Sequence, residues 1–298
     1  MFANIKSKLI LHIIFNKLHK RKKLNLVKHN KLILEKLNIT SKDFQAYISL
    51  KAFNKKFEIN IEDVDIKKFI LKDTFSGNEI IDSLCQMEFK ELESLCLPLN
   101  RIYDINSLER AKFCKLQILN LSYNRIENIS ILEKVNFLEL RELNLSDNAI
   151  NDISVLEKVN FNKLEKLDFS FNKIDSIDIL ENVKLNELKL LQLSENLISN
   201  IKVLERLKFK KLETLRLNGN KISDGDVNAL ERINCKTLNV LDLSCNYLTN
   251  NCRSTLNKIK LQGIKVLNLN WNDIDNFMLG RMNLNELMLL FLLDNLNV

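Results

Sequence analysis

One pattern recurs through most of this chain and constrains its fold more than any other feature. From Leu92 onward the sequence follows L-x-x-L-x-L-x-x-N-x-I in eight units, which begin at Leu92, Leu116, Leu140, Leu164, Leu188, Leu212, Leu238 and Ile264. The units start 24 residues apart five times and then 26 residues apart twice. Each has asparagine at the same place: Asn100, Asn124, Asn148, Asn172, Asn196, Asn220, Asn246 and Asn272. A fixed period of this kind predicts a repeat protein whose stacked units share one core.

The spacing of the leucines predicts a short strand in each unit. Leu119 and Leu121 alternate with Ile118, Asn120 and Ser122, and a period of two is that of a strand with one buried face. We therefore expect the leucines to point inward and the alternating residues to point outward. The asparagine follows where the chain turns away from the strand. Its amide can pair buried backbone groups, which cost about 1–3 kcal/mol each when they are left without a partner, so the asparagines should form a ladder.

The second half of each unit returns to the start of the next strand. Ile126, Ile129 and Leu132 are expected to point inward there. A second inward column consists of Phe89, Phe113, Phe137, Phe161 and Phe209, with Leu185, Cys235 and Leu261 in other units. An acidic column on the same half is expected on the outer surface, paired with neighbouring lysines and arginines: Glu109, Glu133, Glu157, Glu181, Glu205 and Glu231.

The segments "LQILNLSYNRI" (Leu116 to Ile126) and "LRELNLSDNAI" (Leu140 to Ile150) resemble the leucine-rich repeat family, and the resemblance covers about residues 92–275. It implies an α/β fold, a curved right-handed solenoid with a parallel β-sheet on its concave face. We divide the chain into a basic, helical N-terminal region, 1–66, and a solenoid with its terminal caps, 67–298.

The two ends of the solenoid are expected to differ from the inner units, because the terminal core must be hidden from water. Residues 82–91 match only the return half of a unit. At the other end, Leu284, Leu287 and Leu289 have the spacing of a closing unit without its asparagine. The apolar run Leu290 to Leu293 is either part of a cap or a contact for a partner.

The composition disfavours most enzymes. The three histidines are His12, His19 and His29, so the rest of the chain has no histidine for catalysis or metal binding. The 5 glycines do not form the motif of a phosphate-binding loop. The cysteines have no metal-binding spacing, so we expect no metal, no cofactor, no small-molecule substrate and no catalysis. Six cysteines without a convincing signal peptide or membrane span favour a reduced, cytoplasmic protein.

The N-terminal region is strongly basic, with 14 Lys+Arg against 3 Asp+Glu in residues 1–60. Apolar residues in 5–37 have the spacing of two or three short helices. The segment "IIFNKLHKRKKLNLVKHNK" from Ile13 to Lys31 is similar to an F-box, although the leading Leu-Pro of that family is absent. Other interpretations are a helical cap on the first repeat, a mitochondrial presequence and a nuclear localisation signal. A further one is a contact for nucleic acid or anionic membrane through Lys20, Arg21, Lys22 and Lys23.

The concave sheet is the expected binding surface, because its strands present a rigid array of outward side chains. Serine is nearly uniform in the column after the third leucine, which indicates a structural role, whereas the column before the asparagine is diverse. Aromatic residues and arginine are frequent hot spots, so Tyr123, Phe171, Arg216 and Trp271 are the main candidates, and Asp242 on the adjacent strand could orient Arg216. The full candidate set is Tyr123, Glu142, Asn144, Lys166, Asp168, Phe171, Gln192, Glu195, Arg216, Asp242 and Trp271.

These features predict a monomeric, non-enzymatic scaffold or adaptor that binds another protein. Two alternatives share the same fold. The F-box similarity implies a substrate receptor of a cullin-type ubiquitin ligase. The short "N-x-I-x-x-I" form of the repeat is similar to leucine-rich-repeat regulators of protein phosphatases.

The basic cluster Lys20 to Lys23 supplies a first test. If these residues only solvate a cap, replacing all four with Gln should change neither the fold nor the localisation of the protein. The measurements are circular dichroism, binding to anionic vesicles and to nucleic acid at several salt concentrations, and microscopy of the tagged protein. A marked loss of vesicle, nucleic-acid or nuclear binding would contradict this expectation.

Overall fold

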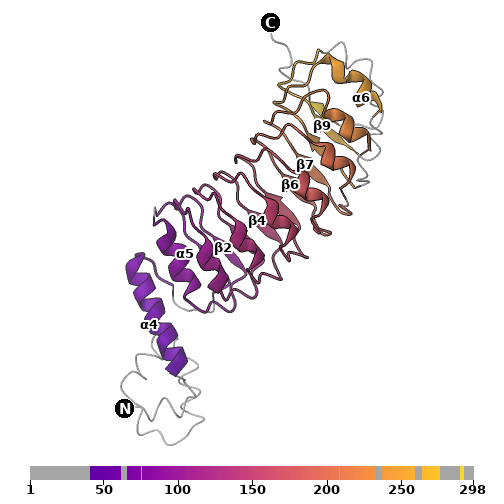
Figure 1. Cartoon of the computed structure of the whole chain (residues 1–298). Coiled ribbons are helices and arrows are strands. Elements are labelled where there is room, and N and C mark those ends of the chain that lie inside the picture. Colours follow the sequence, from indigo (N-terminus) through magenta and orange to yellow (C-terminus); the bar gives the residue numbers. More distant parts are fainter. Residues whose placement is uncertain are drawn as a thin grey trace, which may run out of the picture.

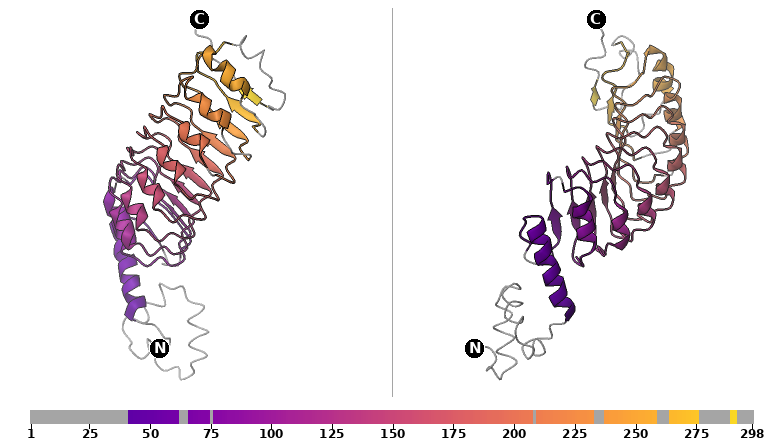
Figure 2. Two further views of the ribbon diagram at one scale, coloured as in Figure 1. Left: turned by 45° about the vertical axis from the view of Figure 1, so that its right-hand side comes forward. Right: turned by 60° about the vertical axis from the view of Figure 1, so that its left-hand side comes forward.

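The computed structural model describes residues 41–61, 66–74, 76–207, 209–232, 237–258, 264–275 and 289–291. Within them, ten short parallel strands form one sheet in strict sequence order (Figure 1). The strands line the inner side of a curved solenoid, and short helices follow its outer side (Figure 2, right). This confirms the predicted solenoid. The helices expected in residues 5–37, the F-box-like segment and the basic cluster lie outside the described residues.

Each strand is three residues long. The strands are β1 (Lys68–Ile70), β2 (Ser94–Cys96), β3 (Ile118–Asn120), β4 (Glu142–Asn144), β5 (Lys166–Asp168), β6 (Leu190–Gln192), β7 (Thr214–Arg216), β8 (Val240–Asp242), β9 (Val266–Asn268) and β10 (Leu289–Phe291). Equivalent residues face one another across neighbouring strands, as Leu119 faces Leu143. The leucines predicted to point inward are buried, and so is the phenylalanine column, in which the rings of Phe113 and Phe137 stack with centroids 6.4 Å apart.

The return half of the inner units is a 3₁₀ helix of one or two turns. These helices are η2 (Asn106–Arg110), η3 (Ser130–Glu133), η4 (Ser154–Glu157), η5 (Asp178–Glu181), η6 (Lys202–Glu205), η7 (Val227–Arg232) and η8 (Asn250–Cys252). Among the described residues, three α-helices lie toward the two ends of the solenoid: α4 (Ser41–Lys56), α5 (Asn78–Cys85) and α6 (Arg253–Lys258). Members of the acidic column pair with basic residues of the next unit, as in Arg206–Glu181 at 2.9 Å, which confirms the outer-surface interpretation. None of the described helices has both the length and the apolar character that a membrane span requires.

The asparagine ladder is present and joins each unit to the one before it. The Asn172 amide nitrogen donates to the carbonyl oxygens of Leu145, Phe169 and Ser170 at 3.0–3.1 Å. Its Oδ1 accepts from the backbone N–H of Ile150 at 2.9 Å. Two of these four partners belong to the preceding unit, so the side chain satisfies turn groups on both sides of the unit boundary.

At the N-terminal end the sheet begins one unit earlier than the sequence pattern indicated. Residues 82–91 were expected to be only a return half, but Phe69 in β1 pairs with Leu95, and the chain reaches α5 through a full unit. Thr74 stands in the asparagine position, where its N–H and hydroxyl bond to Asn100 Oδ1. The pattern missed this unit because phenylalanine and threonine replace leucine and asparagine.

Helix α4 covers the open end of the core beside β1. Leu50 and Phe53 are buried, and the Phe53 ring lies edge-on to Phe69 with centroids 6.0 Å apart. These contacts place α4 over the N-terminal end of the solenoid core.

At the C-terminal end the register differs from the predicted one by three residues. The expected closing unit placed Leu287 as its second leucine, but Leu290 pairs with Leu267 in the structure. In this register Leu287, Leu290, Leu292 and Asn295 restore the repeat pattern in the sequence, although only 289–291 are described. Leucine occupies so many positions here that spacing alone did not fix the register.

The ladder predicts a stability loss on truncation. Asn172→Ala removes the side-chain partner of four backbone groups at a buried site and should lower the free energy of unfolding by about 3 kcal/mol or somewhat more. Thermal or urea unfolding measures the loss. The control is Asn162→Ala, because Asn162 is exposed and its hydrogen bond is to the exposed Asn160. Equal melting temperatures for Asn172→Ala and the parent would show that the ladder argument is wrong.

Candidate functional site

The outward side chains of β4 to β8 form the central part of the inner face, as expected. Glu142 and Lys166 face one another on adjacent strands and form an ion pair of 2.7 Å. Asp168 accepts from the Ser170 N–H at 2.9 Å and from Gln192 Nε2 at 2.7 Å. These candidate side chains therefore bond to one another along the sheet. Lys166 is exposed, and the other three are half-buried.

Arg216, in β7, is exposed on this face between Gln192 and Asp242 on the neighbouring strands. The expected pairing with Asp242 does not form. The Asp242 carboxylate instead accepts from the Ser244 N–H at 3.0 Å and from Asn268 Nδ2 at 3.1 Å. Among the described residues, no hydrogen bond or ion pair holds the Arg216 guanidinium, which leaves its donors directed to solvent.

The serine column does not point outward, although its structural role is evident from its hydrogen bonds. Four of its members are buried: Ser122, Ser170, Ser194 and Ser244. The Ser122 hydroxyl and N–H both donate to Asn120 Oδ1, at 2.7 and 2.9 Å. Asn144 accepts in the same way from Ser146. The strand ends at the residue between the leucines, so the serine already belongs to the turn, and this is why strand alternation placed it wrongly.

The residue before each ladder asparagine lies in the turn that follows its strand, and together these residues form a surface that we call the end ridge: Leu99, Tyr123, Asp147, Phe171, Glu195, Gly219, Cys245 and Trp271. All eight have a left-handed backbone, with φ between 53° and 66°. Glycine adopts this conformation without a steric penalty and Asn or Asp with a small one, whereas for other residues the cost is about 1–2 kcal/mol. The sequence pattern gave no sign of this backbone geometry, because Gly219 is the only glycine in the column.

Large apolar side chains occupy the end ridge without being buried there. Tyr123 is 53% exposed, Phe171 54% and Trp271 61%. The ridge therefore holds bulky residues at positions with a backbone penalty and with little compensating burial. Strained positions of this kind are common at functional sites.

Gly219 leaves a notch in the ridge, and its neighbour Glu195 covers it. A Cβ at Gly219 would overlap the Glu195 carboxylate. Cys245 follows on the other side of the notch. Partial burial raises the pKa of its thiol, and the negative charges of Glu195 and Asp242 add to that effect.

The buried thiols of Cys85 and Cys252 have pKa values raised to about 12, with burial as the largest cause. Reactive cysteines have lowered pKa values, because the thiolate is the nucleophile and the metal ligand. These three thiols are therefore poor nucleophiles. The described residues contain no group of three histidine, cysteine, aspartate or glutamate side chains that could hold a metal ion.

The edge at which the strands begin, the start edge, has charges that neutralise one another between units. Glu165 accepts from Lys189 at 2.8 Å and from Arg141 at 2.5 Å. These two hydrogen bonds lower the pKa of Glu165, and the one from Lys189 has the largest effect. Lys115–Glu91, Lys163–Glu139 and Lys211–Glu187 repeat the arrangement, each at 2.6 Å.

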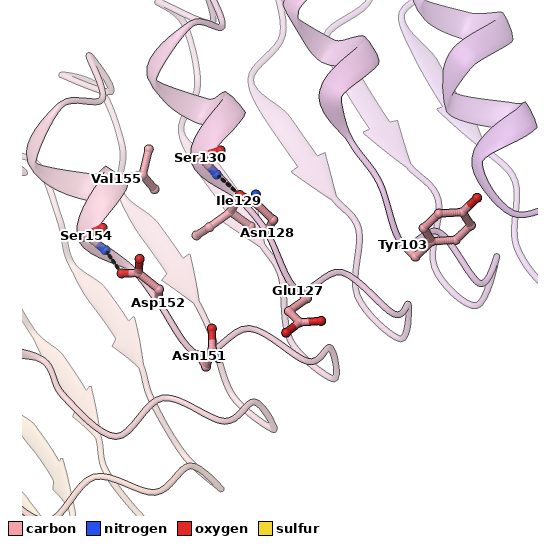
Figure 3. Close-up of a pocket in the computed structure, with 9 residues that line it drawn as sticks. All are labelled: Tyr103, Glu127, Asn128, Ile129, Ser130, Asn151, Asp152, Ser154 and Val155. Atoms are coloured by element: carbon pink, nitrogen blue, oxygen red, sulfur yellow. Dashed lines mark hydrogen bonds between the residues drawn. The ribbon is translucent and has the colours of Figure 1, made fainter.

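A polar hollow of about 580 Å³ lies beside the loops that lead into η3 and η4 (Figure 3). Its wall includes Tyr103 and Glu127. Asn128 and Asp152 also line it, but their side-chain oxygens accept from the N–H groups of Ser130 and Ser154 at 2.8 Å, at the start of η3 and η4. The hollow results from the loops that start the 3₁₀ helices, and it contains none of the predicted site residues.

Comparison with known families identifies the repeat. A family model described as leucine-rich repeats in two copies matches residues 139–182, and a single leucine-rich repeat model matches 114–131 and 210–230. No curated protein sequence matches the chain significantly.

Among solved structures, the chain is similar to internalin C2 from Listeria monocytogenes, with 23% identity and a TM-score of 0.54 over 81% of this chain and 91% of the other. A leucine-rich-repeat protein of Leptospira interrogans has 24% identity and a TM-score of 0.51 over 67% of this chain and 48% of its own. The ectodomain of the Arabidopsis thaliana receptor kinase GASSHO1/SCHENGEN3, in complex with CASPARIAN STRIP INTEGRITY FACTOR 2, has 20% identity and a TM-score of 0.53 over 78% and 30%. At these identities the similarity concerns the fold.

The end ridge yields a prediction that separates stability from function. Asn is well tolerated in the left-handed region, so Phe171→Asn should leave the melting temperature unchanged or raise it slightly, even though it removes a large apolar side chain. Differential scanning calorimetry measures the shift. Phe169→Asn is the contrast, because Phe169 is buried and its replacement should cost about 3–5 kcal/mol. A large loss of stability in Phe171→Asn would assign the ring a packing role.

Proposed function

We propose that this leucine-rich-repeat protein is a scaffold that binds another protein on the inner face and end ridge of its solenoid. The observation that carries the proposal is that Tyr123, Phe171, Arg216 and Trp271 are exposed on a framework that does not depend on them. The framework is held by the leucine core and the asparagine ladder, so these side chains are available for recognition. Aromatic residues and arginine dominate the binding energy of many interfaces.

The dimensions of the surface suit a macromolecular partner. Ten strands spaced about 4.8 Å apart span a surface about 43 Å long. A surface of this length can supply the roughly 800 Å² per partner of a standard interface. The solved complex of the Arabidopsis ectodomain is an example of the same fold in complex with another molecule, and it supports a protein or peptide partner here.

We further propose that the protein is not an enzyme and acts as a monomer in the cytoplasm. The raised pKa values of Cys85, Cys245 and Cys252 support the absence of a cysteine nucleophile. The five described cysteines are free thiols, in keeping with a reducing compartment. The ligase-receptor and phosphatase-regulator alternatives differ in the partner that affinity purification should recover: a cullin adaptor or a phosphatase catalytic subunit.

The proposal predicts that binding and stability respond differently to truncation at the inner face. Arg216→Ala and Trp271→Ala should each weaken binding to the purified partner by about 2 kcal/mol or more if they are hot spots. Arg216→Ala should barely change the melting temperature, because the side chain is exposed and makes no described hydrogen bond or ion pair. Calorimetry on one protein sample gives both quantities.

The matched control is Glu157→Ala on the outer surface, which should alter neither the affinity nor the stability. If both Arg216→Ala and Trp271→Ala bind the partner as tightly as the parent, recognition does not occur at the inner face. The N-terminal region would then be the next surface to test.

A further inference from the structure

A second row of side chains runs beside the end ridge, and three of its basic members form no ion pair among the described residues. The row consists of the residues that directly follow the ladder asparagines, and its basic members include Arg125, Lys173 and Lys221. Their backbone N–H groups bond to carbonyl oxygens of the preceding unit at 2.7–2.8 Å. The row is therefore held in register with the ridge, unit by unit.

The second row differs from the start edge in that the basic residues of the start edge form ion pairs, whereas, in the described part of the chain, Arg125, Lys173 and Lys221 do not. At the start edge, Lys115, Lys163 and Lys211 each pair with a glutamate of the preceding unit at 2.6 Å. Arg125, Lys173 and Lys221 are exposed, and none of them takes part in an ion pair among the described residues. Three cations are thus left to solvent, two of them in units whose ridge residue is an exposed ring.

Between Tyr123 and Lys221 the two rows alternate in character from one unit to the next. Tyr123 with Arg125, and Phe171 with Lys173, combine a ring and a cation in one unit, and the units between them have Asp147 with Ala149 and Glu195 with Leu197. Lys221 continues the basic series beside the notch at Gly219. From Arg125 to Lys221 the cations therefore recur at every second unit, about 9.6 Å apart at the usual strand spacing, with a carboxylate in the ridge between them. Arg101, in the unit before Arg125, lies outside this series.

The spacing of about 9.6 Å between the cations matches one backbone conformation of a bound peptide. Three residues of polyproline II helix advance about 9.3 Å and return to the same face, whereas in a β-strand residues three apart point to opposite faces. A polyproline II segment with an acidic residue at every third position would place one carboxylate at each cation. Its intervening apolar residues could pack on Tyr123 and Phe171. Contiguous acids, or the phosphates of a nucleic acid, would also lie against Asp147 and Glu195 and be repelled.

We propose that Arg125, Lys173 and Lys221, together with Tyr123 and Phe171, bind an extended segment of a protein partner that has an acidic residue at every third position. This inference rests on the proposed function, because it identifies the chemistry of the partner that the scaffold binds. The strained backbone of Tyr123 and Phe171, with φ of 55° at both, supports it, since the fold itself gains little from large side chains there.

The experiment uses three fluorescein-labelled peptides and the full-length protein. The probe is four repeats of Glu-Pro-Leu, a composition that favours polyproline II. One comparison peptide has the same residues with the four glutamates contiguous, and the other has lysine in place of glutamate. An oligonucleotide of twelve thymidines tests nucleic acid. Fluorescence anisotropy should give binding of the spaced probe about tenfold tighter than that of the contiguous one, and no binding of the lysine peptide.

Two triple variants with the same change in charge test the location. Arg125→Gln/Lys173→Gln/Lys221→Gln should weaken binding of the spaced probe by about tenfold or more. Lys115→Gln/Lys163→Gln/Lys211→Gln at the start edge should change it less than about twofold. Phe171→Asn should also weaken binding while the melting temperature is retained.

The inference is overturned if the spaced probe does not bind, if both triple variants weaken it equally, or if the oligonucleotide binds more tightly than the probe. These results are distinguishable from failure of the proposed function. Should the peptides fail while Arg216→Ala still weakens binding to the purified partner, only the assignment of the acidic segment is wrong. Should the partner bind all inner-face and ridge variants normally, both are wrong.

Discussion

The hydrogen bonds of the ladder asparagines are the interaction on which the rest of the structure depends. Each unit must turn sharply out of a three-residue strand, and the turn leaves backbone groups that neither a strand nor a helix satisfies. In Asn172 one amide pairs four of them, two in its own unit and two in the preceding one. The side chain thereby fixes the turn and the stacking of units together, and the leucine and phenylalanine columns can bury one another only in that arrangement.

The same turn creates the surface that we assign to binding. Because the backbone before each asparagine is left-handed, the side chain there is directed away from the core, and its identity is not constrained by packing. Aspartate, glutamate, cysteine, glycine and three aromatic residues all occur in this column. The strand-start edge differs in that its charges pair between units, so that the two edges of one sheet have different properties. The ladder asparagines, which packing and hydrogen bonds constrain, stabilise the fold. The end-ridge residues before them are not constrained in this way and are available for recognition.

The sequence was sufficient to predict the fold of the inner units, because their 24-residue period, their alternating leucines and their asparagines all indicate the same structure. It was insufficient at the two ends. The first unit was missed because Phe69 and Thr74 replace the diagnostic leucine and asparagine, and what identifies it is the pairing of Phe69 with Leu95. The last strand was placed three residues too early, because in a nearly continuous run of leucines several registers satisfy the pattern. Pairing with β9 selects one of them.

For the site, the sequence alone determined which residues vary on a constant framework, and it placed Tyr123, Phe171, Arg216 and Trp271 among the exposed ones. Only the tertiary structure decided which of them are free of local partners. It showed that Asp242 bonds to Ser244 and Asn268 and not to Arg216, and that the serine column is buried. It also showed that Arg125, Lys173 and Lys221, which share one place in the repeat, are exposed and form no ion pair among the described residues. The physical reason is that periodicity fixes the direction of a side chain, whereas hydrogen bonds and ion pairs between residues about 24 positions apart depend on how the units stack.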